Sequence, residues 1–470
     1  MLENVKADKY ERKITSPECL FSRSPYSIVT VVARIKGNVS ESMLIHAVSQ
    51  VQQRHPNLRV RIEEDDEHVL WFTSEEAGEI PIETVARESD EHWIRVLHEA
   101  SQVPFEFDLR PAIRFILVQS PVESELIILC HHIICDGLSL AYLARDLMVR
   151  LEDPTRKVQG VPDPIPIDRD TIPQKVSLNF IVKFLIHRIN RKWEKERAFF
   201  DQQDYRDINQ AYWNKYTHQM LPVELSEAQT RALVERCRRK KVTVNSALAA
   251  AFAGAQNLVQ GAQAYHSSVG VAADLRNRLQ RPVDEVMGFY AGLATLKHNH
   301  DARIGFWENA REFHRQVEPL YTDKNLFQEP LLWCHLEPSI LEAFNFKRLG
   351  GLVPPHSTRY DKLSAFSERD DVILSLLKRN KSDSLDETIM GTAVTNLTRM
   401  DFPTRYGALE LDRLIMNPGG AFPLAMVNVV LGAVTCAGKL SLVVEYAEQT
   451  IDTGTAEKIK DKAMEFLLDE

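Results

Sequence analysis

The sequence lacks several features that mark specialised classes of protein. No apolar stretch is long enough to cross a bilayer, and the N-terminal segment MLENVKADKYERK lacks the apolar core of a secretory signal. The six cysteines are scattered, with neither a CxxC pair nor a dense framework, which indicates reduced and mostly buried thiols. Excess basic charge is also missing, and a net charge of −9 argues against a nucleic-acid partner. We therefore expect a cytoplasmic protein.

The length of the chain predicts more than one domain. Its 470 residues exceed what one hydrophobic core usually organises, while 44% hydrophobic and 26% charged residues are ordinary for a globular protein. Prolines interrupt the middle of the chain at Pro154, Pro162, Pro164, Pro166 and Pro173. Because proline blocks helix, this stretch predicts an extended crossover. We expect one domain over 1–152, a crossover with a basic amphipathic helix over 153–215, and a second domain over 216–470.

Both halves show the alternation of strands and helices that indicates an α/β fold. Runs rich in β-branched and apolar residues predict strands over 27–35, 58–62, 113–118, 126–130, 269–272, 373–377, 426–434 and 440–446. Helical spacing of apolar residues predicts helices that include 44–51, 93–100, 140–151, 180–200, 226–239, 247–255 and 455–468. Asn38, with Glu41 three residues later, Ser226 and Asn245 are the expected N-caps of three of these helices.

The segment HHIICDG over 131–137 is the most informative motif. It ends an apolar strand and directly precedes an amphipathic helix. Side chains alternate across a strand, so His131 and His132 should point in opposite directions, one towards a site and one into the interior. Asp136 lies near the helix start, where free N–H groups favour a carboxylate. Gly137 suits a turn in which a side chain or a negative φ would be obstructive.

Other interpretations of this motif remain open on residue type alone. A single histidine on a strand is usually structural. A metal site could use histidine and aspartate, but adjacent strand residues diverge and do not readily chelate one ion, so we expect no metal. Cys130 or Cys135 could be a nucleophile, although thiols in an apolar stretch are usually inert. The combination of His, His, Asp and Gly, with a strand before it and a helix after it, favours a catalytic motif.

The motif and several other segments resemble the condensation-domain superfamily of HHxxxDG acyltransferases, which have a chloramphenicol-acetyltransferase-like fold. The stand-alone polyketide-associated enzymes of the phthiocerol dimycocerosyl transferase and alcohol acetyltransferase types are the most similar group. Besides HHIICDG, the matching segments follow the family's order along most of the chain: RHPNLRVR (54–61), PFEFDLRPAIRF (104–115), VTVNSALAAAFA (242–253), ADLRNRL (273–279) with the following Gly288-Phe289, and VTNL (394–397).

This resemblance implies two such domains that form a pseudo-dimer around a central channel. It implies that His132 is the general base, which takes a proton from the acceptor as the acceptor attacks an acyl thioester, without an acyl-enzyme. Asp136 would pair with Arg276 of the second domain, and His131 and Gly137 would be structural. Without the resemblance, Arg276 would be a solvated surface charge. Asn396 is the candidate for polarising the thioester carbonyl or shaping the channel.

The resemblance leaves the reaction partners open. The co-substrate would be acyl-CoA or a phosphopantetheine thioester on an acyl carrier protein, and the acceptor a small alcohol or amine, in lipid, polyketide or natural-product biosynthesis. Transfer to a hydroxyl is the first hypothesis. Amide formation and a non-catalytic, carrier-binding role are the alternatives. The DFGWG-like segment of some relatives is missing; the corresponding region is 405–420.

The helix over 180–197 is apolar at its start and basic at its end. It could pack across the two domains, cover the channel, or contact a membrane surface. The internal pseudo-dimer makes a monomer the expected oligomeric state.

Overall fold

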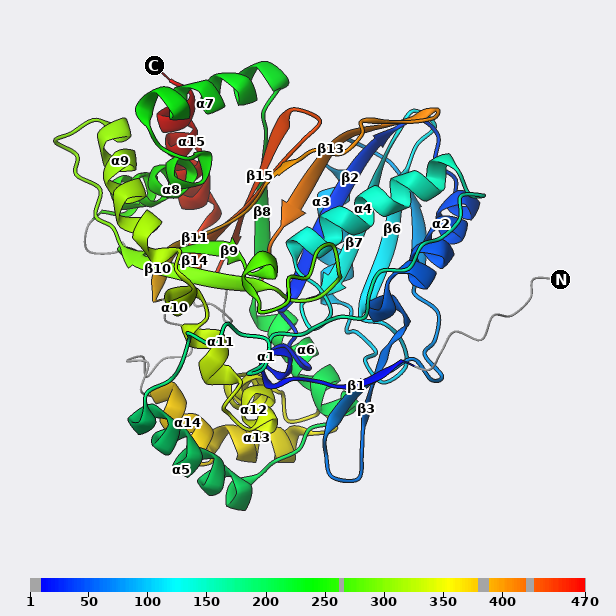
Figure 1. Ribbon diagram of the computed structural model, residues 1–470, viewed down its shortest axis with the longest axis vertical. Coiled ribbons are helices and arrows are strands. Elements are labelled where there is room, and N and C mark those ends of the chain that lie inside the picture. Colours follow the sequence, from blue (N-terminus) through cyan, green and yellow to red (C-terminus); the bar gives the residue numbers. More distant parts are fainter. Residues whose placement is uncertain (1–9, 262–265, 379–388, 420–426, 470) are drawn as a thin grey trace.

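The computed structural model describes residues 10–261, 266–378, 389–419 and 427–469. Two six-stranded sheets lie side by side, and helices cover their outer faces (Figure 1). We call the part built on the sheet β12-β13-β2-β7-β6-β5 the N-lobe and the part built on β10-β9-β11-β14-β15-β8 the C-lobe. A small sheet, β1-β4-β3, lies beside the N-lobe. The expected two-lobed α/β architecture is confirmed.

The N-lobe consists mainly of the first 152 residues. Its strands and those of the small sheet are β1 (Glu11–Lys13), β2 (Ile28–Lys36), β3 (Arg61–Glu64), β4 (Leu70–Thr73), β5 (Ile82–Ala86), β6 (Ile113–Gln119), β7 (Glu123–His131), β12 (Arg405–Tyr406) and β13 (Leu409–Asn417). Its helices are α1 (Ser16–Cys19), α2 (Glu41–Arg54), α3 (His92–Gln102) and α4 (Gly137–Glu152), with a 3-10 turn over Pro56–Arg59.

The C-lobe carries more helix than the N-lobe. Its strands are β8 (His218–Glu224), β9 (Ser268–Asp274), β10 (Ala291–Lys297), β11 (Met390–Met400), β14 (Val427–Cys436) and β15 (Lys439–Ala447). Helices α7 (Glu227–Lys240), α8 (Val244–Gln260), α9 (Phe306–Val317) and α15 (Thr453–Leu468) lie on its outer side. Short 3-10 turns lie at Arg276–Arg278, Glu318–Leu320 and Gly350–Leu352.

A group of helices packs below the two sheets (Figure 1). It consists of α5 (Phe180–Glu196), α6 (Gln202–Lys215), α10 (Asp323–Leu326), α11 (Gln328–Trp333), α12 (Pro338–Leu349), α13 (Tyr360–Glu368) and α14 (Val372–Lys378). The predicted strand over 373–377 is therefore wrong. Asp371 accepts a hydrogen bond from the Leu374 amide at 3.1 Å and starts a helix there, because an apolar run of this length fits a buried helix as well as a strand.

Most predicted elements are present, but two helix starts were misplaced. Ser40, not Asn38, caps α2 by accepting from the Met43 amide, and Thr243, not Asn245, caps α8 by accepting from the Ser246 amide. In each case a hydroxyl at the true helix boundary competes with an asparagine two residues away. The predicted strand over 58–62 begins only at Arg61, because the 3-10 turn occupies its first part.

The two lobes exchange secondary structure. Strand β13, from the second half of the chain, pairs antiparallel with β2 of the N-lobe and also contacts β14 and β15 of the C-lobe. The expected domain boundaries at 153–215 did not include this exchange, because they assigned all of 216–470 to the second domain. It couples the lobes, because the N-lobe sheet is incomplete without residues 405–417.

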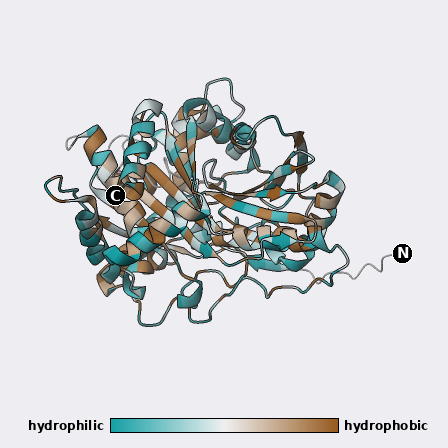
Figure 2. Cartoon of the chain, turned by 90° about the horizontal axis from the view of Figure 1, so that it is seen from above, coloured by the Kyte–Doolittle hydropathy of each residue, from teal (hydrophilic) through white to brown (hydrophobic). Residues whose placement is uncertain are grey.

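The crossover between the lobes, residues 153–179, contains neither helix nor strand and packs partly against the C-lobe. Ile167, Ile172 and Val176 are buried with Leu275 and Val283 in one apolar cluster. Figure 2 shows apolar residues gathered along the strands and polar residues on the outer helices. Within the described ranges, no helix is both long and apolar enough to span a membrane.

Candidate active site

The two histidines of the motif lie at the end of β7, which pairs with β2. His131 is the last residue of the strand and pairs with Ile28, and the His132 amide donates to the carbonyl of Ser27 at 2.8 Å. The chain then turns, and α4 begins at Gly137. The backbone of both histidines is therefore held by β2.

The His131 side chain lies in an apolar environment. It is fully buried, with the rings of Phe105 and Phe107 edge-on at 5.6 and 4.9 Å between centroids. Its Nε2 hydrogen-bonds the carbonyl of Ser24 at 2.9 Å, and its Nδ1 accepts from the Ile133 amide at 3.3 Å. Burial lowers the pKa of His131 to about 3. His131 is therefore neutral at neutral pH and has both ring nitrogens bonded.

The His132 side chain has different neighbours and remains partly exposed. Its Nδ1 hydrogen-bonds the carbonyl of Cys135 at 3.2 Å, and the rings of Phe21 and Phe289 lie 5.4 and 5.6 Å from it. Since a carbonyl only accepts, Nδ1 carries the hydrogen of the neutral ring and Nε2 carries the lone pair. Burial lowers the pKa of His132, against the opposing effects of the Cys135 and Pro418 carbonyls and the Asp136 charge. The imidazole is thus neutral and basic at Nε2.

Asp136 and Arg276 form an ion pair between the lobes. The two guanidinium nitrogens donate to the two carboxylate oxygens, both at 2.8 Å, and the residues are only 5% and 3% exposed. The structure thus brings together these two residues, as the resemblance implied, and the surface-charge alternative for Arg276 is wrong. Burial raises the pKa of the Asp136 carboxyl, but the Arg276 guanidinium and the hydrogen bonds from Ser139 together outweigh this effect, and the net pKa is lowered.

Further groups complete this ion pair. The Ser139 and Tyr290 amides donate to Asp136 at 2.8 and 3.0 Å, and the Ser139 hydroxyl links Arg276 to the carbonyl of Gly288. Ser139 was not among the predicted site residues, although the position of Asp136 three residues before it, at a helix start, could have indicated it. Tyr290 was not predicted either, because it acts through its backbone and has no sequence signal.

Of the two reasons expected for Gly137, an obstructive side chain and an obstructive negative φ, the structure supports only the first. Its φ is not in the left-handed region, and it is the first residue of α4. A Cβ at this position would lie 3.0 Å from the Leu397 side chain of β11. Close approach of the C-lobe, not backbone conformation, therefore favours glycine here.

Asn396 lies in β11, just before a bulge in its pairing with β14. Its side-chain oxygen accepts from the Thr398 amide at 2.7 Å, and Thr398 has a positive φ of 62°. The Asn396 carbonyl group thus stabilises the bulge. Across the described part of the chain, no hydrogen bond joins Asn396 to His132, so its expected role stays a prediction.

The alternative nucleophile and metal chemistries find little support in this arrangement. Cys130 and Cys135 are fully buried, and burial raises the pKa of the Cys135 thiol well above its usual value, which disfavours the reactive thiolate. Over the residues with described positions, no group of three His, Cys, Asp or Glu side chains could hold a metal ion.

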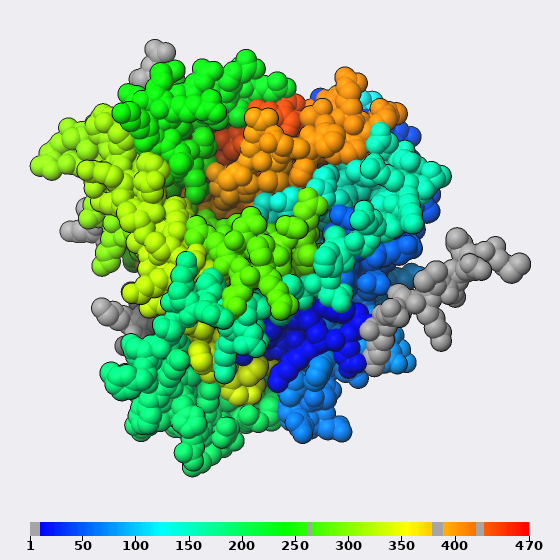
Figure 3. Space-filling view, in the orientation of Figure 1, coloured from blue at the N-terminus to red at the C-terminus, as the bar shows by residue number. Residues whose placement is uncertain are grey.

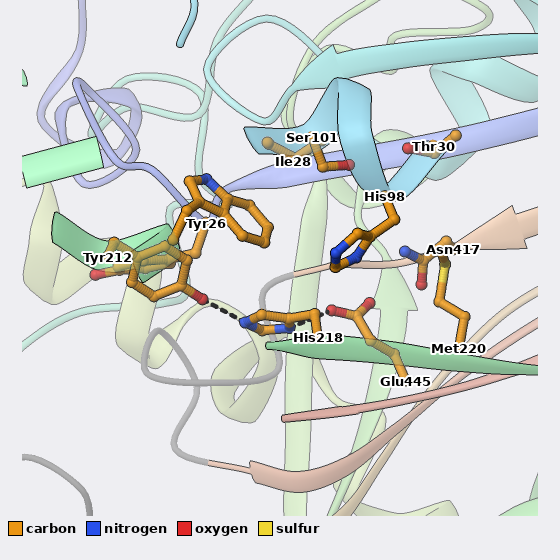
Figure 4. A pocket seen from close by; sticks show the side chains of 12 residues that line it. Tyr26, Ile28, Thr30, His98, Ser101, Tyr212, His218, Met220, Asn417 and Glu445 are labelled. Atoms are coloured by element: carbon orange, nitrogen blue, oxygen red, sulfur yellow. Dashed lines mark hydrogen bonds and ion pairs between the residues drawn. The ribbon is translucent and has the colours of Figure 1, made fainter. Parts of the chain in front are cut away.

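A small pocket lies between the lobes near the same end of β2 (Figure 4). The Tyr212 hydroxyl bonds His218 Nε2, and His218 Nδ1 bonds Glu445 at 3.0 Å. The second Glu445 oxygen and the Asn417 amide oxygen are buried, and neither has a partner among the described groups. With a volume of about 30 Å³, the pocket fits one water molecule better than an acyl chain. Nothing in the sequence patterns indicated this cluster.

Two segments of the chain match known protein families. Residues 18–157 match the condensation domain, and residues 215–318 match the phthiocerol/phthiodiolone dimycocerosyl transferase C-terminus. These segments contain the HHxxxDG motif and Arg276, respectively. The chain belongs to the condensation-domain acyltransferase family. The model matched by residues 215–318 is that of a transferase.

Curated relatives of this condensation-domain protein include large peptide synthetases. A dimodular nonribosomal peptide synthase of Bacillus subtilis is 30% identical over 152 residues, which are 31% of this chain and 6% of that protein. The nonribosomal peptide synthetase dtxS1 of Metarhizium robertsii is 21% identical over 316 residues, which are 61% of this chain and 4% of that protein. The chain thus spans only a small part of these relatives.

Solved structures share the fold over nearly the whole chain. Trichothecene 15-O-acetyltransferase TRI3 of Fusarium sporotrichioides has a TM-score of 0.63 at 11% identity, covering 98% of this chain and 95% of that chain. Polyketide synthase associated protein 5 of Mycobacterium tuberculosis has a TM-score of 0.58 at 15% identity, with 98% of both chains covered. At these identities the likeness shows the fold, and the reaction has to be argued from the site.

Proposed function

We propose that the protein transfers an acyl group from a thioester, acyl-CoA or an acyl carrier protein, to an acceptor hydroxyl, with His132 as general base. The hydrogen bond from His132 Nδ1 to the Cys135 carbonyl carries this proposal. It orients the ring and leaves the lone pair on Nε2, while the lowered pKa keeps that nitrogen unprotonated at neutral pH. A positioned base of this kind contributes about 10²–10⁴-fold to a rate.

In the proposed reaction the acceptor oxygen attacks the thioester carbonyl as its proton moves to His132 Nε2. The C–S bond then breaks, and the thiolate takes that proton from the imidazolium. The carbonyls of Cys135 and Pro418 and the charge of Asp136 all favour the imidazolium, so they stabilise the intermediate protonation state. No acyl-enzyme forms, and the remaining acceleration comes from aligning the two substrates.

Asp136 and Arg276 act as positioning residues in this proposal. Their bidentate ion pair is buried, and Asp136 also caps α4 by accepting from Ser139. The turn from His132 to Asp136 is therefore attached to both lobes. This attachment holds the His132 ring in one orientation, which favours a reaction that depends on alignment.

A hydroxyl acceptor is supported by the O-acetyltransferase among the structural relatives. Amide formation is the second candidate, because the curated sequences that match the chain are peptide synthetases. Both reactions use the same base and release the same thiol. A panel of alcohol and amine acceptors therefore separates them.

The decisive experiment measures thiol release from a panel of acyl-CoA and acyl-carrier donors, with and without alcohols and amines. We expect acceptor-dependent release, with alcohols preferred, and a loss of about 10²-fold or more in His132→Ala. His46→Ala, at an exposed histidine on α2, is the matched control and should retain full activity.

Equal rates in wild type and His132→Ala would contradict the assignment of the base. Binding of an acylated carrier without turnover by any acceptor would support the non-catalytic alternative instead. The melting temperatures of His132→Ala and His46→Ala, compared with that of wild type, show whether each variant is folded.

A further inference from the structure

Helix α5 exposes four large apolar side chains over its first two turns. Phe180 is 80% exposed, Ile181 54%, Phe184 58% and Leu185 43%. Phe180 and Phe184 are four residues apart, as are Ile181 and Leu185, and Ile181 and Phe184 are three apart, so these side chains form one patch on the helix surface. Exposed apolar residues are ordinary when scattered, but a contiguous patch marks an interaction site.

The opposite face of α5 is held firmly against the helices below the sheets. Ile186 and Trp193 are buried, and the Trp193 indole donates to the Ser339 hydroxyl at 2.8 Å. Asn190 donates to the carbonyl of His335 at 2.9 Å, and Asn179 caps the helix by accepting from the Val182 amide. The exposed patch is therefore presented by an anchored helix and does not depend on a loose segment.

The second half of α5 is basic. The helix carries five lysines and arginines and two glutamates, although the whole protein has a net charge of −9. Its five basic side chains are exposed: Lys183, Arg188, Arg191, Lys192 and Lys195. Arg188, Arg191 and Lys192 continue along the helix from the apolar patch, and the Arg188 guanidinium lies 6.0 Å from the Phe184 ring.

The position of α5 makes this surface accessible. The helix lies at the lower edge of the molecule, outside α12, α13 and α14 (Figure 1). The space-filling view shows it as a projecting border and not as the wall of a groove (Figure 3). A convex apolar surface can insert into a lipid layer, because lipids rearrange around it. A protein partner would need a groove of matching shape.

We propose that α5 docks the protein on an anionic lipid surface, with the Phe180, Ile181, Phe184 and Leu185 patch inserted among the head groups and acyl chains. Exposed aromatic and aliphatic residues favour the interfacial region, and the neighbouring lysines and arginines attract anionic head groups. Helix α7 also carries five lysines and arginines and two glutamates, but its apolar Leu233 is buried. Only on α5, of these two helices, do exposed basic side chains adjoin an exposed apolar patch, and this combination commits the site to anionic lipid. The proposal does not depend on the transfer reaction.

The experiment is co-sedimentation of the full chain with vesicles of phosphatidylcholine, alone or mixed with anionic phosphatidylglycerol, at low and high salt. Wild type should bind the anionic vesicles, bind phosphatidylcholine alone at least about tenfold more weakly, and lose affinity in high salt. The double variant Phe180→Ser/Phe184→Ser should bind anionic vesicles at least about tenfold more weakly. Arg188→Glu/Lys192→Glu should do the same, because it reverses the attracting charge.

Helix α7 offers a matched control. Arg238 and Arg239 are exposed basic residues there, while the apolar Leu233 of that helix is buried. Arg238→Glu/Arg239→Glu makes the same change in net charge and should leave vesicle binding unchanged. Equal melting temperatures verify that the α5 variants fold, as exposed positions allow.

Three outcomes would overturn the proposal: no binding of wild type to anionic vesicles, wild-type binding by the Phe180→Ser/Phe184→Ser variant, or equal loss in the α7 control. Competition by an acidic carrier protein that removes α5-dependent vesicle binding would also overturn it, because it would assign the patch to a protein partner.

Discussion

The surroundings of His131 and His132, on the two sides of the chain at the end of β7, differ sharply, although the two histidines are neighbours in sequence. On one side, His131 is enclosed by aromatic rings and has both nitrogens bonded to N-lobe backbone. On the other side, His132 is partly exposed, bonds through one nitrogen to Cys135, and lies next to an ion pair that joins the lobes. These different surroundings suit a structural role for His131 and the proposed role of general base for His132.

The largest stability difference between the two sides should come from Asp136. Asp136→Asn removes the bidentate partner of the buried Arg276 guanidinium and leaves it only the Asp274 carboxylate at 3.1 Å, so we expect a loss of up to about 3–5 kcal/mol in the free energy of unfolding. The double variant Asp136→Asn/Arg276→Met also removes the buried Arg276 charge and should recover part of this loss. Denaturant titrations of both variants measure the difference. A single variant within about 1 kcal/mol of wild type would contradict the ion pair's role.

On the other side of the strand, His131→Phe should cost less stability, about 1–3 kcal/mol, because it keeps a ring but leaves the Ser24 carbonyl and Ile133 amide unpaired. The variant should also be less sensitive to acid. The pKa of His131 is about 3 in the fold, so below pH ~6.5 the unfolded chain binds a proton that the native state does not.

Wild type should therefore lose stability as pH falls from ~6.5 towards the folded pKa, by up to about 1.4 kcal/mol per pH unit more than His131→Phe. Denaturant titrations at several pH values compare the two proteins, and the carboxylates they share cancel in the difference. Parallel pH profiles would show that His131 is not kept neutral by the fold.

The smallest expected effect concerns the pH at which catalysis is half-maximal, compared with the ordinary pKa of histidine. In the proposed reaction the neutral form of His132 is the base. Because the pKa of His132 is lowered, kcat/KM should rise with pH to a plateau, with a midpoint below 6.5. His131 does not contribute to this limb, because its pKa is lower still. A midpoint above 6.5 would indicate a base in a more polar or more acidic setting than His132 occupies.

Much of this arrangement follows from local sequence. The position of Asp136 at a helix start and the apolar stripe of α4 are consequences of helix-end chemistry and side-chain period, and the structure has both as predicted. Predictions failed where one sequence pattern is compatible with two structures. The apolar run at 373–377 was predicted as a strand but belongs to helix α14. At the starts of α2 and α8, two nearby polar residues could each have been the cap. In these places packing against other segments decides the outcome.

The site also depends on segments far apart in the chain. Family resemblance, and not spacing, indicated that Asp136 would meet Arg276, 140 residues away. No pattern indicated that the Tyr290 amide would donate to Asp136 or that Leu397 would lie close to Gly137. None indicated that β13 would join the N-lobe sheet. Local periodicity and capping thus set which segments are strands and helices and where the HHxxxDG motif turns. The burial and charge state of His131 depend on its neighbours in the N-lobe, and the pairing of Asp136 and the contact at Gly137 depend on the C-lobe. Only the tertiary structure decides these features, because the neighbours come from segments far apart in the chain and meet only on folding.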